Sequence, residues 1–451
     1  MTASLEALSA ALAGGTVTSR QLVEECLERV QDPAGEGRKT FLHLDADNAR
    51  RAADAVDAAR RDGAEQRPWA GIPVSVKDLF DIAGQVTTAG SVVMKTAPAA
   101  LHDAEPVARL KAAGFVVLGR TNMTEFAYSG VGINPHYGTP ANAWRRDELR
   151  RIPGGSSSGA AISVTDGMAA AAHGTDTGGS CRIPAALNGI AGFKPTAAAV
   201  PMGGAYPLSP SLDSVGPLAA TARCCAIMHS VLADTPAVLD ARADLGSLRL
   251  AIPQTVVLDG LDAHVASCFF ASVSRLSAAG VDVRELALRQ FGELAAVNVK
   301  GGLVAAEAYA AQMERLRLHG GQFDPRVRVR MEKAMAQTPQ DYADLLAFRR
   351  EWIRSVTASM EGADLLVCPT VPTIAPAIDA LANDDEFGRV NLAMLRNPTF
   401  ANFLDGCAIS IPCHPAGTAP AGLMLIGRQG DDARVLAAAQ AIESLLWQAG
   451  H

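Results

Sequence analysis

A stretch of small residues in the middle of the chain constrains the fold more than any other sequence feature. Residues 154–196 are dominated by glycine, serine and alanine, within a 451-residue chain that is 49% hydrophobic. Because glycine adopts backbone conformations closed to other residues, a long glycine-rich stretch in an ordered core indicates turns that need them. Two such turns stand out, Gly154–Gly159 and Gly174–Ser180. We therefore expect both turns to lie inside the fold.

Predicted strands alternate with predicted helices around this stretch. Short apolar runs predict strands at residues 72–77, 115–119, 169–172, 248–252, 365–368 and 423–426. Helices are predicted after the capping box of Thr18 and Gln21, at 45–61, 107–113, 263–279 and 431–449, and over most of 297–360. Such alternation predicts an α/β architecture. Since no Pro/Ser-rich linker divides the chain, we expect one domain over residues 1–451.

Composition excludes several classes of protein. The net charge of -7, without a basic patch interleaved with aromatic residues, argues against a nucleic-acid partner. No run of about 18 apolar residues predicts a membrane span, and residues 1–12 lack the pattern of a signal peptide. The eight cysteines form no C-x-x-C pair and no histidine cluster has metal-ligand spacing. We therefore expect a cytoplasmic protein with free thiols, no metal site and no membrane attachment.

The second turn offers a candidate nucleophile. Gly174–Ser180 leads into a short helix predicted at 181–187, and such a turn presents successive backbone N–H groups that can hold an anion. A serine at its end, Ser180, can attack a carbonyl while these groups stabilise the developing oxyanion. The first turn also matches the G-x-S-x-G pattern of a nucleophile elbow, but no predicted strand precedes it.

A serine nucleophile needs a base. Lys77 ends a predicted apolar strand, where loss of hydration favours the neutral amine. To be half neutral near pH 7, its pKa must fall by about 3 units, worth roughly 4 kcal/mol. Other interpretations remain: a surface salt bridge between Lys77 and Asp78, or a histidine base, His173 or His136, the latter better suited to packing in its loop.

Further sequence blocks accompany the two turns in a fixed order. They occupy residues 71–78, 87–91, 119–126, 134–140, 153–159, 174–186 and 192–196, with weaker echoes at 211–218 and 422–427. In this combination the chain resembles the amidase signature family, most strongly over about residues 70–219. The resemblance implies an α/β fold with a large mixed β-sheet covered on both faces by α-helices.

The resemblance also implies a catalytic mechanism. Lys77 matches the base of the family's Ser-cisSer-Lys triad, Ser156 the serine held by a cis peptide, and Ser180 the nucleophile. The backbone N–H groups of Thr177, Gly178, Gly179 and Ser180 match the oxyanion hole. No metal or organic cofactor is implied. The expected activity is hydrolysis of a small-molecule carboxamide to a carboxylate and ammonia or an amine, through an acyl-enzyme on Ser180.

Several neighbouring residues are candidates for support or substrate binding. Ser157 and Ser158 are expected either to hydrogen-bond Lys77 or Ser156, or to satisfy the turn. Asp176 is expected to brace the loop, and Arg182 to form an internal ion pair or to anchor a substrate carboxylate. The segments expected to shape the pocket are 129–137, which includes Gly130 and Val131, 202–208, and parts of 297–376, namely 297–313 and 370–376.

Two alternative functions remain open. The glutaminase subunit of a tRNA-dependent amidotransferase shares the triad, but it usually has glutamine where this chain has Ile183. An inactive scaffold relative is the other, although all three triad positions are filled. The sequence leaves open the identity of the amide, the size and polarity of the pocket, and the oligomeric state, for which a homodimer is one candidate.

Overall fold

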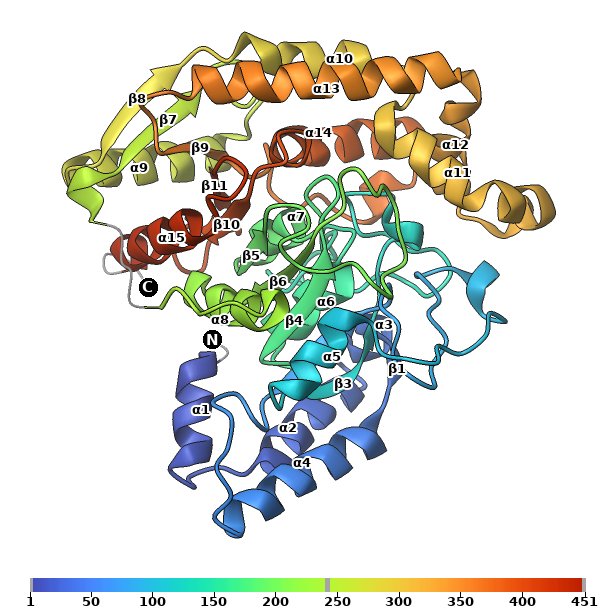
Figure 1. Ribbon diagram of the computed structural model, residues 1–451, viewed down its shortest axis with the longest axis vertical. Helices are drawn as coiled ribbons and strands as arrows, with labels where there is room; N and C mark the ends of the chain where they lie inside the picture. Colours follow the sequence, from blue (N-terminus) through green and yellow to red (C-terminus); the bar gives the residue numbers. More distant parts are fainter. Residues whose placement is uncertain (1–2, 240–243, 448–451) are drawn as a thin grey trace.

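A mixed β-sheet runs through the whole molecule (Figure 1). The computed structural model describes residues 3–239 and 244–447, and within them the sheet has 11 strands in the order β1-β3-β2-β4-β6-β5-β10-β11-β9-β7-β8. The pairs β2–β3, β2–β4, β7–β8 and β7–β9 are parallel, and the other neighbouring pairs are antiparallel. The predicted α/β class with a large mixed sheet is therefore confirmed.

The strands are short and lie far apart in sequence. Their bounds are β1 Phe41–Leu44, β2 Pro73–Lys77, β3 Val116–Thr121, β4 Ala171–Thr175, β5 Ala191–Lys194, β6 Val215–Ala219, β7 Arg249–Pro253, β8 Asp282–Leu286, β9 Leu365–Pro369, β10 Ala408–Pro412 and β11 Gly422–Ile426. The helices are α1 Leu5–Ala13, α2 Ser19–Gln31, α3 Gly37–Thr40, α4 Ala46–Arg61, α5 Glu105–Ala112, α6 Ser158–Thr165, α7 Arg182–Asn188, α8 Ala222–Ala233, α9 Ala263–Ala278, α10 Leu294–Val297, α11 Gly302–His319, α12 Pro325–Glu332, α13 Pro339–Ser359, α14 Asp384–Phe403 and α15 Asp432–Trp447.

Helices bury both faces of the sheet. Along β11, Leu423 and Leu425 join a core that includes residues of α8 and α15, whereas Met424 and Ile426 join a core that includes residues of α13 and α14. Successive strand side chains point to opposite faces, so these are two separate layers of packing. No helix in the described part of the chain is long and apolar enough to cross a membrane.

Predicted elements appear close to their expected positions. The capping box of Thr18 and Gln21 begins α2, and the predicted helices at 45–61 and 263–279 are α4 and α9. The last predicted helix is α15, although residues 448 and 449, like Met1 and Thr2 of the N-terminal segment, lie outside the described residues. Five strands had not been predicted, namely β1, β5, β6, β8 and β10.

Candidate active site

Lys77 lies at the end of β2, beside the end of a parallel neighbour, β4. The register places Val76 opposite His173, so Lys77 and Thr175 leave the sheet at the same edge. The Lys77 Nζ donates hydrogen bonds to Ser156 Oγ at 2.7 Å and to Thr175 Oγ1 at 2.8 Å. Ser156 comes from the turn before α6, and the peptide bond that precedes it, Gly155–Ser156, is cis. The structure therefore brings together two of the three residues that the resemblance implied.

Burial determines the protonation of Lys77. Its side chain has no exposed surface, and loss of hydration lowers its pKa to about 8. Both hydrogen-bond partners are neutral hydroxyls, and no carboxylate in the described residues forms an ion pair with the amine. Asp78, the expected salt-bridge partner, instead pairs with Arg120 at 2.6 Å. The interpretation as a surface Lys–Asp pair is therefore wrong.

Ser180 lies in the loop that joins β4 to α7, next to the Ser156 turn. The Ser157 N–H donates to the Ser180 carbonyl oxygen at 3.3 Å, so the two segments are in backbone contact. The Ser180 hydroxyl has no hydrogen-bond partner in residues 3–239 and 244–447, and it does not hydrogen-bond Ser156. Hydrogen bonds of a catalytic relay are often long in a free enzyme and shorten when substrate binds.

A buried ion pair fixes the shape of this loop. Asp176 accepts hydrogen bonds from the N–H groups of Gly179 at 2.8 Å and Cys181 at 3.0 Å, and it pairs with Arg182 at 2.8 Å. Burial opposes ionisation, but the Arg182 guanidinium holds the pKa of Asp176 well below its usual range. Asp176 therefore occupies the bracing position expected from the sequence.

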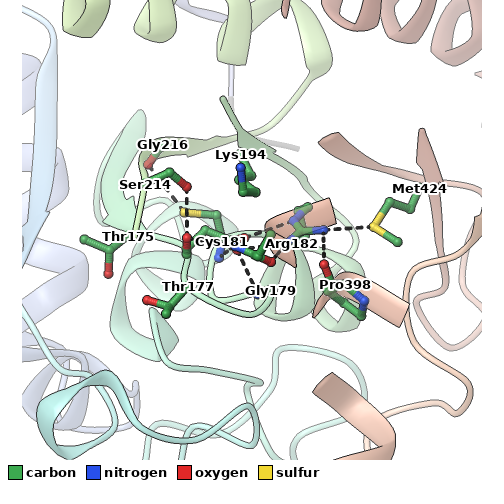
Figure 2. Close-up of polar contacts among 12 residues, drawn as sticks. Thr175, Thr177, Gly179, Cys181, Arg182, Lys194, Ser214, Gly216, Pro398 and Met424 are labelled. Atoms are coloured by element: carbon green, nitrogen blue, oxygen red, sulfur yellow. Dashed lines mark hydrogen bonds and ion pairs between the residues drawn. The ribbon is translucent and has the colours of Figure 1, made fainter. Parts of the chain in front are cut away.

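Arg182 points into the protein interior. Figure 2 shows its guanidinium directed toward Pro398, whose carbonyl oxygen it reaches at 2.9 Å, and toward the sulfur of Met424. All three of its side-chain nitrogens have partners, and the residue has no exposed surface. The alternative in which Arg182 binds a substrate carboxylate does not fit this geometry.

Three of the four expected oxyanion-hole donors are unoccupied. The Gly179 N–H donates to Asp176. Only glycine fits this position, because its φ is 122° and a Cβ would lie 2.5 Å from Pro398. The N–H groups of Thr177, Gly178 and Ser180 have no acceptor among the residues that the structure describes. These three groups remain able to bind an incoming oxygen.

The other nucleophile and base candidates are disfavoured by their surroundings. His173 stacks on Phe80 with ring centroids 3.9 Å apart, and burial lowers its pKa to about 3. His136 contacts Glu125 at 3.0 Å in its loop. Burial raises the pKa of the Cys181 thiol, which lies against the Gly216 carbonyl oxygen.

The remaining candidate residues pack around the site without contacting the Lys77 amine or the Ser156 hydroxyl. The Ser157 hydroxyl bonds the Thr175 carbonyl oxygen, and the Ser158 hydroxyl bonds that of Asn122, so neither contacts Lys77 or the Ser156 hydroxyl. The Gly130 N–H donates to Asn391 Oδ1 at 2.8 Å, and Val131 is fully buried. Gly130 and Val131 do not line the cavity over Ser180, whereas the adjacent Ser129 does.

A cavity of about 140 Å³ lies over Ser180. Its apolar wall consists of Ala127, Leu208, Leu212, Leu303, Val304, Leu395 and Phe403. Its polar groups come from Tyr128, Ser129, Thr177, Asn298, Arg330 and Thr399. Segments 202–208 and 297–313 therefore contribute to the cavity wall, whereas no residue of 370–376 lines it.

Sequence reasoning missed two groups here. Thr175 accepts a hydrogen bond from the amine of Lys77, and it lies beyond the strand predicted at 169–172, because β4 extends to Thr175. Arg330 on α12 lines the cavity, its guanidinium lies 4.3 Å from the centre of the Tyr128 ring, and no carboxylate in the described ranges pairs with it. No local pattern around Arg330 distinguishes it from Arg326 and Arg328 of the same helix.

The comparisons with known proteins identify the family of this chain. The family model described as Amidase matches residues 21–436. The chain belongs to the amidase signature family. Enzymes of this family hydrolyse C–N bonds. In the described part of the chain, no three His, Cys, Asp or Glu side chains gather as a metal site.

Relatives of this amidase signature chain have different activities. A 2-amino-5-chloromuconic acid deaminase from Comamonas testosteroni is 34% identical, over 96% of this chain and 94% of its own. A glutamyl-tRNA(Gln) amidotransferase subunit from Roseiflexus sp. (strain RS-1) is 35% identical, over 94% and 93%. A crystal structure of an amidase superposes with a TM-score of 0.87 at 32% identity, covering 98% of this chain and 100% of the other.

Proposed function

We propose that this chain is an amidase that hydrolyses a small carboxamide through an acyl-enzyme on Ser180. The observation that supports it most is the buried amine of Lys77, 2.7 Å from the Ser156 hydroxyl. An uncharged amine has two N–H groups and one lone pair. It can therefore donate to Thr175 and accept the Ser156 proton at the same time.

The proposed reaction passes protons along this relay. Ser180 attacks the amide carbon as its proton moves to Ser156, and the Ser156 proton moves to Lys77. The tetrahedral oxyanion binds the free N–H groups of Thr177, Gly178 and Ser180. Ser156 then gives a proton to the leaving nitrogen and recovers one from Lys77. A water molecule releases the carboxylate by the same steps.

Replacement of the nucleophile or of the base tests this proposal. We expect Ser180→Ala and Lys77→Ala each to lower ammonia release from a panel of simple amides by at least about 1000-fold, because each removes a group of the relay. Ser163→Ala is the matched control, since Ser163 is a fully buried serine of α6 whose hydroxyl pairs with that of Ser75 and not with Lys77 or Ser156. The measurement is ammonia release by folded protein, together with labelling by a fluorophosphonate and mass spectrometry. Label on a residue other than Ser180 would refute the proposal.

We further propose that the substrate carries a carboxylate that Arg330 binds. Arg330 is a cation in the wall of the Ser180 cavity without an acidic partner in the described residues. A guanidinium binds a carboxylate through charge-assisted hydrogen bonds. The deaminase from Comamonas testosteroni supports this assignment, since its name gives an acid as its substrate.

An arginine replacement on α12 tests the substrate class. We expect Arg330→Met to lower kcat/KM for succinamic acid by roughly 10- to 100-fold, the value of a hydrogen bond to a charged group, and to change that for neutral butanamide only slightly. Arg328→Met is the control, because Arg328 lies on the same helix but pairs with Glu332 outside the cavity. An equal loss for both amides would contradict carboxylate recognition.

The amidotransferase component remains a second candidate function, because a protein of that kind is similar over nearly the whole chain. The purified chain alone, assayed with glutamine and with simple amides, distinguishes the two. Ammonia release without a partner or tRNA supports the free amidase, and release only in a complex supports the amidotransferase component. Native mass spectrometry of the same sample determines the oligomeric state, for which a homodimer is one candidate.

A further inference from the structure

A second cavity lies on the other side of the strand that carries Lys77. Its volume is about 1070 Å³, and it is bordered by β1, β3, α4 and the loop after β2. None of the residues that line the Ser180 cavity lines this one. The two cavities are therefore separate sites.

Arg120, one of the residues of the conspicuous block 119–126, lies in the wall of this cavity. It is 1% exposed, and its Nε donates to Asp78 Oδ1 at 2.6 Å. Its Nη1 and Nη2 are buried and have no acceptor within the described ranges. An unpaired buried donor lowers the free energy of unfolding by about 1–3 kcal/mol, and by more when the group is charged. Because Arg120 has two such donors, Nη1 and Nη2, an acceptor that a ligand supplies would be favourable here.

Other cavity residues complement Arg120. The Asp78 carboxylate does not satisfy the free nitrogens, because it is already occupied by Thr88 and by the Gly90 N–H. Lys95 lies on the exposed rim with its amine 5.0 Å from the centre of the Tyr137 ring. Gln85 presents a third unpaired buried atom, the acceptor Oε1, while its amide nitrogen donates to Asp45.

We propose that this cavity binds a small molecule whose carboxylate or phosphate group accepts hydrogen bonds from Arg120 Nη1 and Nη2. The forked guanidinium matches the geometry of either oxyanion. Lys95 adds positive charge at the entrance, and Gln85 Oε1 accepts a hydrogen bond from an O–H or N–H group of the same ligand. This binding is independent of the proposed hydrolysis on Ser180.

Titration calorimetry with two probes, inorganic phosphate and succinate, tests the site and distinguishes the two oxyanions. We expect one or both to bind wild-type protein at millimolar concentration. Arg120→Lys keeps a cation beside Asp78 but removes the fork, and should weaken binding about tenfold. Succinate can also bind Arg330 in the Ser180 cavity, so the binding that persists in Arg330→Met belongs to this second site.

Two milder variants keep the test independent of the folding of Arg120→Lys. Gln85→Ala and Lys95→Gln leave the buried ion pair between Arg120 and Asp78 intact. We expect Lys95→Gln to weaken binding of both probes about threefold, because it removes one positive charge. The proposal is overturned if neither probe binds, if Lys95→Gln and a folded Arg120→Lys bind like wild type, or if Arg330→Met abolishes binding.

Discussion

Lys77 differs from a surface lysine in the chemistry of its surroundings. Its amine is removed from water and contacts two hydroxyls rather than a carboxylate, so the lost hydration of the charged form outweighs the attraction of the nearby Asp176 and Asp213. A fall in pKa from 10.5 to about 8 corresponds to roughly 3 kcal/mol in favour of the neutral amine. This single environment makes the residue suitable as a base near neutral pH.

This environment predicts the pH dependence of the reaction. Below a pKa of about 8, Lys77 gains a proton and can no longer act as a base, so activity should fall on the acidic side. We expect kcat/KM to decrease about tenfold per pH unit there, reaching roughly 100-fold at pH 6. The measurement is a pH profile with a neutral amide, with Ser163→Ala as control. An apparent pKa near 6.5 on the acidic side of the profile would instead indicate a histidine base.

The loop between β4 and α7 depends on one buried charge pair. Asp176 holds two backbone N–H groups of the loop and also neutralises Arg182, which has no other acidic partner in the described chain. Removing one partner of a buried pair leaves the other charge uncompensated, which is strongly destabilising. The conformation of the loop that carries Ser180 therefore depends on this pair.

We expect Asp176→Asn to lower the free energy of unfolding by about 3–5 kcal/mol and also to reduce turnover, because the loop that carries Ser180 loses its brace. The matched control is Asp364→Asn. Asp364 pairs with Arg249 and Arg434, whose side chains are about half exposed, so its loss should cost about 1 kcal/mol or less. Denaturant unfolding followed by activity assays measures both. Equal costs for the two variants would contradict the bracing role.

The sequence predicted those elements that carry a strong local pattern. The strand ending at Lys77 and the helix after the capping box were predicted because their apolar periodicity is clear. Strand β6 was missed because Gly216 and Pro217 are unusual in strands. Gly216 is required by a distant contact, since a Cβ there would lie 2.0 Å from the Phe193 carbonyl oxygen. Local patterns cannot reveal such a constraint.

Across the whole molecule, the two serines of the proposed relay are close in sequence, whereas the residues of the pocket are not. The turns that carry Ser156 and Ser180 lie within one continuous stretch, and the resemblance predicts a role for each. The cavity wall combines segments from residue 127 to residue 403, including Arg330 and Phe403. Which side chains reach the cavity depends on how α12 and α14 pack, so the substrate class could not be read from the sequence.

Two helices that lie far apart in the sequence meet through a buried carboxyl group. Glu443 of α15 is 5% exposed and accepts a hydrogen bond from the Ala222 N–H at 3.0 Å, at the start of α8. Burial raises its pKa to about 8, so the folded protein holds a proton there that the unfolded chain releases near pH 4.5. The stability gained from this proton is complete below pH 4.5, declines as the pH rises, and is lost above about 8.

Glu443→Gln should therefore remove this pH dependence, because an amide stays neutral and its oxygen still accepts the Ala222 N–H. Between pH 6 and pH 9 the free energy of unfolding of the wild-type protein falls by about 2–3 kcal/mol more than that of the variant. The Tm of the variant relative to wild type should therefore be higher by roughly 3 °C at pH 9 than at pH 6. Thermal unfolding at both pH values measures the shift. Glu361→Gln, an exposed position, should show none. If Glu443→Gln and Glu361→Gln show the same change in Tm between the two pH values, Glu443 is already ionised in the folded protein. The Ala222 N–H would then donate to a charged carboxylate.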